Sequence, residues 1–386
     1  MAFIALATAS LGLAACSDEE DAEATPTEAV ATATEAATQE VAATPTATEE
    51  AAHEDAEASA GALVAALRLI DTAGFHGMDE TLNGDTPAID ASWAGATSRA
   101  IAAAQAVAWP EELHAAVDLF VADAQALLEA IEADDAATAA PLAVAVHESQ
   151  HALSNDAFAH LAGLSGSDDS PGAMLAALVY VDTAGFHGMD EALNGGSPAI
   201  EASWLGATRR ALASAQVVAW GDLQPAADTF IGDATTLLAA LEADDLEAAA
   251  LAAVAVHESQ HALSHDAYHA LGELSAADDA AGARLAAIIL IDSAGFHGID
   301  DALAATPTIE AGWSGKVGNA LTAARAVDWG EQQPAADAFI ASASALLEAI
   351  DADDAAAAAV PAHDAHETQH ALSHDVYGAV GGGHAH

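Results

Sequence analysis

The chain has 386 residues, 53% of them hydrophobic, and its 60 Asp and Glu side chains outnumber 7 Lys and Arg, which gives a formal charge of -53 at pH 7. This charge repels nucleic-acid phosphates and anionic lipid headgroups, so it excludes a nucleic-acid-binding protein and favours cations as partners. A disulfide framework is excluded as well, because Cys16 is the only cysteine.

The N-terminal segment MAFIALATASLGLAAC is a short apolar run that ends in the pattern of a bacterial lipobox. We therefore predict a lipoprotein signal at 1–16, attachment to the membrane through lipid at Cys16, and an extracytoplasmic location in the cell envelope. No Lys or Arg precedes the apolar run, and a plain cleaved signal is the alternative. Residues 17–58 are rich in Thr, Pro, Ala and acidic side chains and lack aromatic ones, so we predict a disordered tether.

The motif TAGFHGMDE begins at Thr72 and again at Thr183, and SAGFHGIDD follows at Ser293, so a unit of about 110 residues occurs three times. Each unit predicts four helices: one through GFHG, one from a Thr-Pro or Ser-Pro start to a Trp, one ending at an acidic EADD or DADD turn, and one carrying HESQHALS or its equivalent. Because β-branched alternation is scarce, we predict an all-α fold of tandem four-helix bundles. The predicted bundle repeats are 59–165, 170–275 and 280–380, followed by a flexible His-containing tail at 381–386.

The fourth predicted helix carries two histidines four residues apart. In the first repeat, Val144, His147, His151, Ser154 and Phe158 follow one another in steps of three and four, which is the pattern of an inward-facing seam. We therefore expect both histidines in the bundle core, where buried imidazoles need hydrogen-bond partners or a metal ion.

The first predicted helix places His76 and Asp79 on one face. A second stripe of the same helix is wholly apolar, and if it alone faces the core, His76 points outward or toward a neighbouring domain. This rival stripe consists of Leu67, Ile70, Met78 and Leu82.

Two glycines, Gly74 and Gly77, bracket this histidine. Two glycines inside a helix cost roughly 2 kcal/mol relative to alanine. We expect close approach of a neighbouring group to His76 to offset that cost, because glycine lets other atoms come near the backbone.

Together the two helices offer three imidazoles and one carboxylate, an N3O ligand set that suits iron, copper or zinc. Inward-facing His and carboxylate side chains hold metals in this way in helical bundles. We predict one transition-metal site per repeat. The predicted ligands are His76, Asp79, His147 and His151; His187, Asp190, His257 and His261; and His297, Asp300, His366 and His370.

Three other interpretations stay open. HESQH fits the H-E-x-x-H pattern of zinc peptidases, in which Glu148 and its counterparts Glu258 and Glu367 would be the base. Paired bundle histidines also serve as axial haem ligands, and without a C-x-x-C-H motif a haem would be bound noncovalently. Finally, the histidines of a noncatalytic envelope scaffold would be purely structural.

The string Gly74-Phe75-His76-x-x-Asp79-x-x-Leu82 and its counterparts resemble the G-F-H-x-x-E-x-x-L motif of the imelysin-like family of extracytoplasmic iron-uptake lipoproteins. The resemblance implies a helical protein that binds metal at His76 and Asp79, and at their counterparts, in iron or copper acquisition. Members of that family have also been considered metallopeptidases. Asp here replaces the Glu of the motif.

The sequence thus predicts a lipid-anchored extracytoplasmic protein that binds iron, copper or zinc for acquisition or storage. A noncatalytic protein is favoured over an enzyme, which stays an open alternative. Haem is the less favoured cofactor, and an envelope protein is a further predicted partner.

Overall fold

The computed structural model describes residues 59–380 apart from 197, 274–280 and 306–307. This part of the chain forms fifteen α-helices and three short 3-10 helices without a β-strand, so the predicted all-α class is confirmed. The predicted signal with Cys16, the tether at 17–58 and the tail at 381–386 lie outside the described residues.

The helices recur in groups of five. The first group is α1 (Ala60–Asp71), α2 (Phe75–Leu82), α3 (Ser92–Ala106), α4 (His114–Glu132) and α5 (Ala136–Leu161). The second is α6 (Pro171–Thr183), α7 (Phe186–Leu193), α8 (Ala202–Val217), α9 (Gln224–Glu242) and α10 (Leu246–Gly272). The third is α11 (Ala281–Ser293), α12 (Phe296–Ala305), α13 (Trp313–Ala326), α14 (Gln333–Asp351) and α15 (Ala355–Val380).

Five helices replace the expected four because the chain breaks before each GFHG histidine. Gly74, Gly185 and Gly295 adopt φ values of 84°, 81° and 78°, a left-handed conformation that glycine enters more readily than residues with a Cβ. The prediction of a glycine inside a continuous helix was therefore wrong at this position. A Cβ at Gly77 would meet nothing within 4 Å, so close approach does not explain that glycine either.

The acidic turn joins two helices into a hairpin. Asp134 has a φ of 52°, and the N–H of Asp135 donates to the carbonyl of Ala130 at 3.0 Å, which closes α4 with a Schellman motif. The side chain of Asp135 then accepts from the N–H of Thr138 and caps α5. Two consecutive acidic residues therefore end one helix and begin the next, as the sequence predicts.

The predicted start of the second helix at a Thr-Pro or Ser-Pro pair was wrong, because α3, α8 and α13 begin at Ser92, Ala202 and Trp313, beyond the pair of their repeat. Helix α3 begins at Ser92, five residues beyond Pro87, and Asp90 accepts a hydrogen bond from the backbone N–H of Ser92 at 2.8 Å. The Asp side chain organises this turn, whereas the proline lies in the non-helical segment before it.

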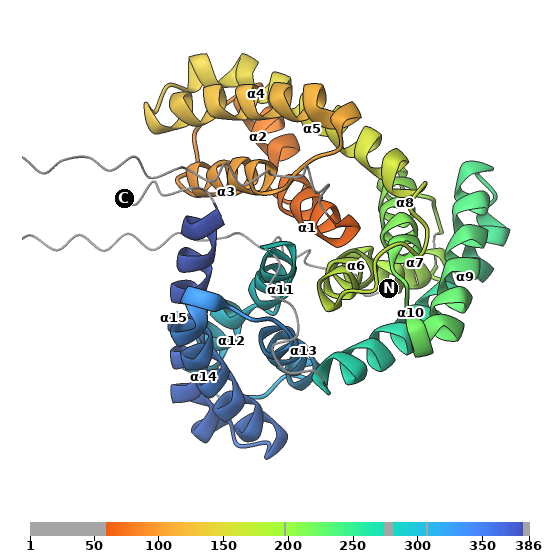
Figure 1. The fold of residues 1–386 in the computed structure, drawn as a ribbon, viewed down its shortest axis with the longest axis vertical. Helices are drawn as coiled ribbons and strands as arrows, with labels where there is room; N and C mark the ends of the chain where they lie inside the picture. Colours follow the sequence, from red (N-terminus) through yellow and green to blue (C-terminus); the bar gives the residue numbers. More distant parts are fainter. Residues whose placement is uncertain (1–58, 197, 274–280, 306–307, 381–386) are drawn as a thin grey trace, which may run out of the picture. The chain divides into compact units, whose positions relative to one another are not determined.

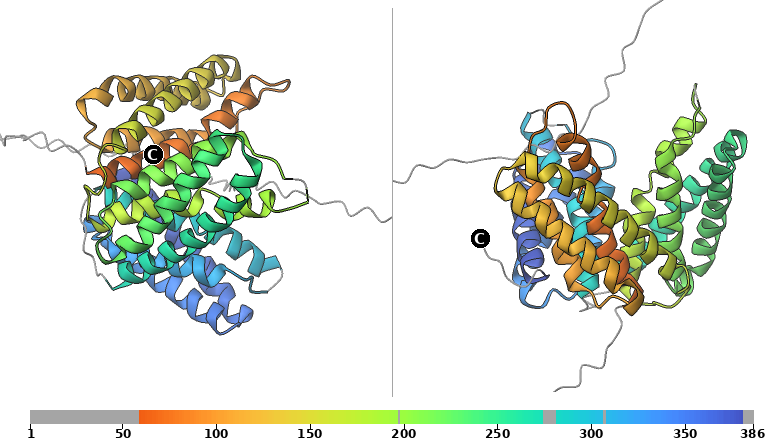
Figure 2. Two further views of the ribbon diagram at one scale, coloured as in Figure 1. Left: turned by 90° about the vertical axis from the view of Figure 1, so that its right-hand side faces the viewer. Right: turned by 90° about the horizontal axis from the view of Figure 1, so that it is seen from above.

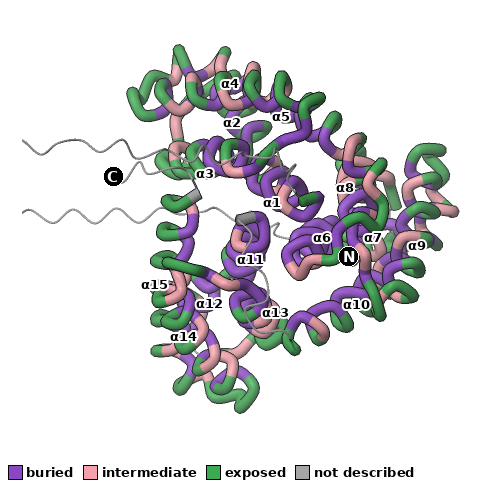
Figure 3. Tube along the Cα trace, in the orientation of Figure 1, coloured by how far each residue is buried: buried purple, intermediate pink, exposed green. Residues whose placement is uncertain are grey.

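Helices α1, α6 and α11 pack against one another at the centre of the described part of the chain, which forms one compact unit (Figure 1). Most of their residues are buried (Figure 3). The contact is close because it uses glycine: a Cβ at Gly61 would lie 2.5 Å from the Cα of Ala173, and one at Gly282 would lie 2.5 Å from the Cα of Ala62.

The three groups also contact one another farther out. Helix α5 packs on α8, α10 packs on α13, and α15 packs back on α3, so each group touches the next and the third touches the first. The hairpins α4/α5, α9/α10 and α14/α15 lie outside the central helices, as Figure 2 shows from two further directions. The buried side chains of all three groups form one continuous hydrophobic cluster.

One stretch of the described chain, Gly282–Ala305, is long and apolar enough to cross a membrane by composition. In the structure 67% of its qualifying window is buried inside the unit, and the stretch is broken into α11 and α12. It packs here as a core segment.

Candidate metal centre

The left-handed glycine positions the GFHG histidine. Because the chain turns at Gly74, α2 leaves the line of α1 and buries Phe75 and Met78 against the core. His76 and Asp79 then lie on the other side of α2, which packs along α5. The apolar stripe of this segment faces the core, yet the histidine still reaches the last helix of its repeat.

Three imidazoles meet there, and we call His76, His147 and His151 the His trio of repeat 1. The Nε2 atom of His147 lies 3.3 Å from Nδ1 of His76 and 2.9 Å from Nε2 of His151. The ring centroids are 4.8 and 4.7 Å apart. Residues 71 positions apart in the chain are thus brought together by the contact between α2 and α5.

The other two repeats form the same trio. In repeat 2, Nε2 of His257 lies 3.1 Å from Nδ1 of His187 and 3.0 Å from Nε2 of His261. In repeat 3, His366 stands in the same way 3.2 Å from His297 and 2.9 Å from His370. Nine of the twelve predicted ligands therefore lie in contact in groups of three, one group in each repeat.

The predicted carboxylate has a different position. Oδ2 of Asp79 lies 2.9 Å from Nδ1 of His147, on the opposite edge of that ring from the other imidazoles. Asn83 holds the carboxylate by donating to Asp79 Oδ1 at 3.0 Å, and it also donates to the carbonyl of Ala140 on α5. Asp79 therefore orients His147 and does not converge with the trio. Asp190 and Asp300 bond His257 and His366 in the same way, at 2.8 and 3.1 Å.

This orientation selects one tautomer of the middle ring. When the imidazole is neutral and its Nδ1–H donates to the carboxylate, the lone pair is on Nε2, and a carboxylate–histidine pair of this kind raises the basicity of a metal-binding imidazole. Burial and the neighbouring His147 lower the pKa of His151, and burial and His366 lower that of His370. The imidazoles of His151 and His370 therefore stay neutral, and able to coordinate a metal ion, to lower pH than an ordinary histidine.

The trios lie at the surface, contrary to the prediction that His147 and His151 occupy the core. The side chain of His76 is 68% exposed and that of His147 is 17% exposed, while His151 is exposed. The buried face of α5 is rotated away from the predicted seam. It consists of Ala139, Ala143, Val146, Ser149, Gln150, Leu153, Ser154, Ala157 and Leu161.

The donor set fits a bare metal ion better than a haem. In each trio, nitrogens of two rings lie close to Nε2 of the middle histidine. The lone pairs of these nitrogens repel one another unless a proton or a cation lies between them, and neutral imidazole is a ligand of zinc, copper and iron. Two axial nitrogens of a haem iron would lie about 4 Å apart, twice a metal–nitrogen bond, which is wider than any of these contacts. As the rings stand, no group of three or more His, Cys, Asp or Glu among the described residues surrounds a common point. Binding would therefore require the exposed rings of His76 and His151 to rotate.

The third site has an additional imidazole. His363 occupies the position of Val144 and Val254, and its Nδ1 lies 3.1 Å from the Asp300 oxygen that also bonds His366. This hydrogen bond raises the pKa of His363. The glutamates of the HESQH-type segments, Glu148, Glu258 and Glu367, are exposed beside their histidines.

A partly buried polar network accompanies each trio and was missed by the sequence-based prediction. Asp71, at the end of α1, accepts hydrogen bonds from Gln150 at 2.6 Å, from Ser154, and from the hydroxyl of Tyr180 at 3.1 Å. Asp182 and Asp292 repeat it, and burial raises the pKa of both carboxyls. The sequence contained a signal for this network, because an Asp stands at or next to the end of the apolar first helix of every repeat.

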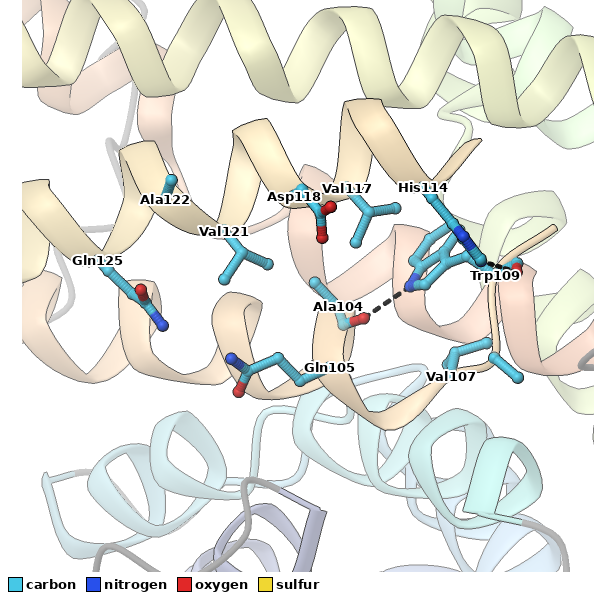
Figure 4. Close-up of a pocket in the computed structure, with 11 residues that line it drawn as sticks. Ala104, Gln105, Val107, Trp109, His114, Val117, Asp118, Val121, Ala122 and Gln125 are labelled. Atoms are coloured by element: carbon cyan, nitrogen blue, oxygen red, sulfur yellow. Dashed lines mark hydrogen bonds between the residues drawn. The ribbon is translucent and has the colours of Figure 1, made fainter. Parts of the chain in front are cut away.

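A groove of about 500 Å³ lies between α3 and α4, away from the trios (Figure 4). Trp109 and His114 form one end of it, with the Trp109 Nε1–H donating to the carbonyl of Ala104 at 2.6 Å. The His114 ring is held by the carbonyl of Trp109 at 2.7 Å. The ring nitrogens at this end of the groove are thus engaged with backbone carbonyls.

Comparisons of the chain with protein-family models, with curated proteins and with solved structures give no match.

Proposed function

We propose that this protein binds transition-metal cations without catalysing a reaction, at one His trio in each repeat, and that it serves metal acquisition or storage at the cell envelope. Zinc, copper and iron all suit imidazole ligands. Lipid at Cys16 would hold the folded part outside the cytoplasm, as the lipobox pattern predicts.

The observation that carries the proposal is the threefold recurrence of one arrangement. In each repeat, two helices bring one nitrogen of each outer imidazole within 2.9–3.3 Å of Nε2 of the middle histidine, and a carboxylate bonds the far nitrogen of that middle ring. Histidines at the surface contribute little to core packing. A purely structural role therefore does not explain why the same arrangement occurs in all three repeats. The charge of -53 would concentrate cations around the sites.

The test removes the middle histidine of each trio, in the variant His147→Ala, His257→Ala, His366→Ala. We expect the variant to bind about three fewer Zn²⁺ ions per chain, one for each trio, because each trio loses the ring that both other rings contact. Equilibrium dialysis followed by elemental analysis measures this loss. The matched control is His114→Gln with His160→Ala, which removes histidines outside the trios. An unchanged metal content in the triple variant, with altered stability alone, would establish the scaffold interpretation instead.

A second variant tests the orienting carboxylates. Replacing Asp79, Asp190 and Asp300 together by Asn should retain the number of bound ions and lower their affinity by about 10–100-fold, the effect expected for an outer partner of a ligand histidine. If all bound metal disappears at saturating Zn²⁺, the carboxylates are ligands themselves.

One observation favours a peptidase as the second candidate. Each trio has two exposed imidazoles beside a half-buried one, so a bound zinc would have a fourth coordination position open to water, as in catalytic zinc sites, and Glu148 follows the middle histidine. The variant Glu148→Gln, Glu258→Gln, Glu367→Gln discriminates. A peptidase would lose hydrolysis of an unfolded protein substrate, whereas our proposal expects no zinc-dependent hydrolysis in either chain.

A further inference from the structure

Helix α10 carries histidines beyond its trio. His257 and His261 belong to the trio of repeat 2, and His265 and His269 continue the series at intervals of four residues. Four residues advance an α-helix by about 6 Å and just over one turn, so consecutive members of the series are neighbours on one face.

The two added histidines are open to solvent. His265 and His269 are both exposed, and the side chain of His265 is 80% exposed. Nδ1 of His265 lies 3.0 Å from Oδ1 of Asp266. A carboxylate that accepts the Nδ1 proton leaves Nε2 of His265 as the free, metal-binding nitrogen, which is the relation that Asp190 has to His257.

The pair is specific to repeat 2. At the corresponding positions of α5 the chain has Asn155 and Ala159, and both are exposed as well. Those two residues show that the fold does not require imidazoles at this place. Glu273, one further turn along, is exposed and adds a carboxylate to the same face.

From this arrangement we propose that His265 and His269 form an additional, bidentate site for a divalent transition-metal cation. Two histidines at i and i+4 on an exposed helix face chelate one ion, and water or Glu273 would complete its coordination. The midpoint of this pair lies about 12 Å along the helix from the midpoint of His257 and His261, too far for the two pairs to share an ion. Repeat 2 would therefore hold one cation more than repeat 1.

The experiment compares the full chain with His265→Asn, with His269→Ala and with the double variant. These substitutions introduce the residues of repeat 1, so folding should be retained, which circular dichroism checks. We expect each variant to bind about one Zn²⁺ ion fewer than the unchanged chain at saturating Zn²⁺, because a single imidazole does not chelate. His114→Gln, which introduces the residue of repeats 2 and 3, is the control and should change nothing.

A direct localisation uses Cu²⁺, whose unpaired electron broadens the NMR signals of nearby rings. Broadening of the His265 and His269 ring signals in the unchanged chain supports the site. Equal Zn²⁺ content in the double variant, or broadening confined to other histidines, overturns it. The proposal does not depend on the His trios, since loss of ions from the chain with His147→Ala, His257→Ala and His366→Ala reports on those sites separately.

Discussion

At the scale of single residues, one hydroxyl changes its position between repeats. Asp182 and Asp292 accept a hydrogen bond from Tyr268 and Tyr377, which lie on the last helix of their own repeats. The equivalent residue of repeat 1 is Phe158, and the hydroxyl on Asp71 comes instead from Tyr180 on α6 of the next repeat. The two rings are in edge-to-face contact at 5.3 Å. A buried carboxylate keeps its third donor although the donor comes from a different helix.

This exchange predicts a rescue. Tyr180→Phe should lower the free energy of unfolding by about 1.5–3 kcal/mol, because it removes a hydrogen bond to a buried charged group. Adding Phe158→Tyr should restore most of that loss by placing the hydroxyl where repeats 2 and 3 have it. Urea unfolding of the single and double variants measures both effects. Equal stability of Tyr180→Phe and the unchanged chain would show that this hydroxyl contributes nothing.

At the scale of elements, the two glycines of GFHG have different roles. Gly74 is the left-handed residue between α1 and α2, and without it α2 would continue the axis of α1. Gly77 lies inside α2 with free space around its Cα. The first glycine is demanded by backbone conformation, and we have no structural reason for the second.

The glycine pair predicts effects of opposite sign. Gly74→Ala should destabilise the protein by about 1–2 kcal/mol through left-handed strain, and it should disturb the contact between His76 and His147. Gly77→Ala should be neutral or stabilising by up to about 1 kcal/mol, because alanine favours a helix interior. Thermal unfolding of both variants provides the comparison. Two variants of similar stability would contradict the assignment of the break to Gly74.

At the scale of the whole described unit, the repeats are joined through their first helices. Gly61 and Gly282 allow α1 to approach α6 and α11 at backbone distance, and the linker residue Asp168 accepts a hydrogen bond from the N–H of Gly61 at 3.0 Å. Because apolar side chains from all three groups share one cluster, unfolding one repeat would expose the central faces of the other two.

The shared centre predicts cooperative unfolding. The unit should unfold in one transition, and Gly61→Ala should lower the free energy of unfolding by about 1–3 kcal/mol through overpacking against Ala173. Gly232→Ala, at an exposed and unobstructed position of α9, is the control and should not destabilise. Calorimetry on the full chain checks both. Separate transitions for the three repeats would show that they fold independently.

The sequence predicted the features that depend on interactions between residues close together in the chain. Alanine-rich helical periodicity established the all-α class, acidic pairs such as Asp134 and Asp135 marked the helix hairpins, and the spacing of His147 and His151 identified a histidine pair on one helix face. The sequence-based prediction placed the histidine face of α5 in the core, whereas it lies at the surface. Steps of three and four fit several overlapping stripes of one helix, and only packing against the neighbouring helices decides which stripe is buried.

Only the tertiary structure decided which residues that are distant in the chain contact one another. It brought His76 to His147, placed Asp79 against Nδ1 of His147 and not among the three contacting imidazoles, and gathered the first helices of all three repeats at one centre. Such contacts depend on how one helix lies against another. A one-residue rotation of α5 leaves its local pattern almost unchanged, yet it moves an imidazole between core and surface.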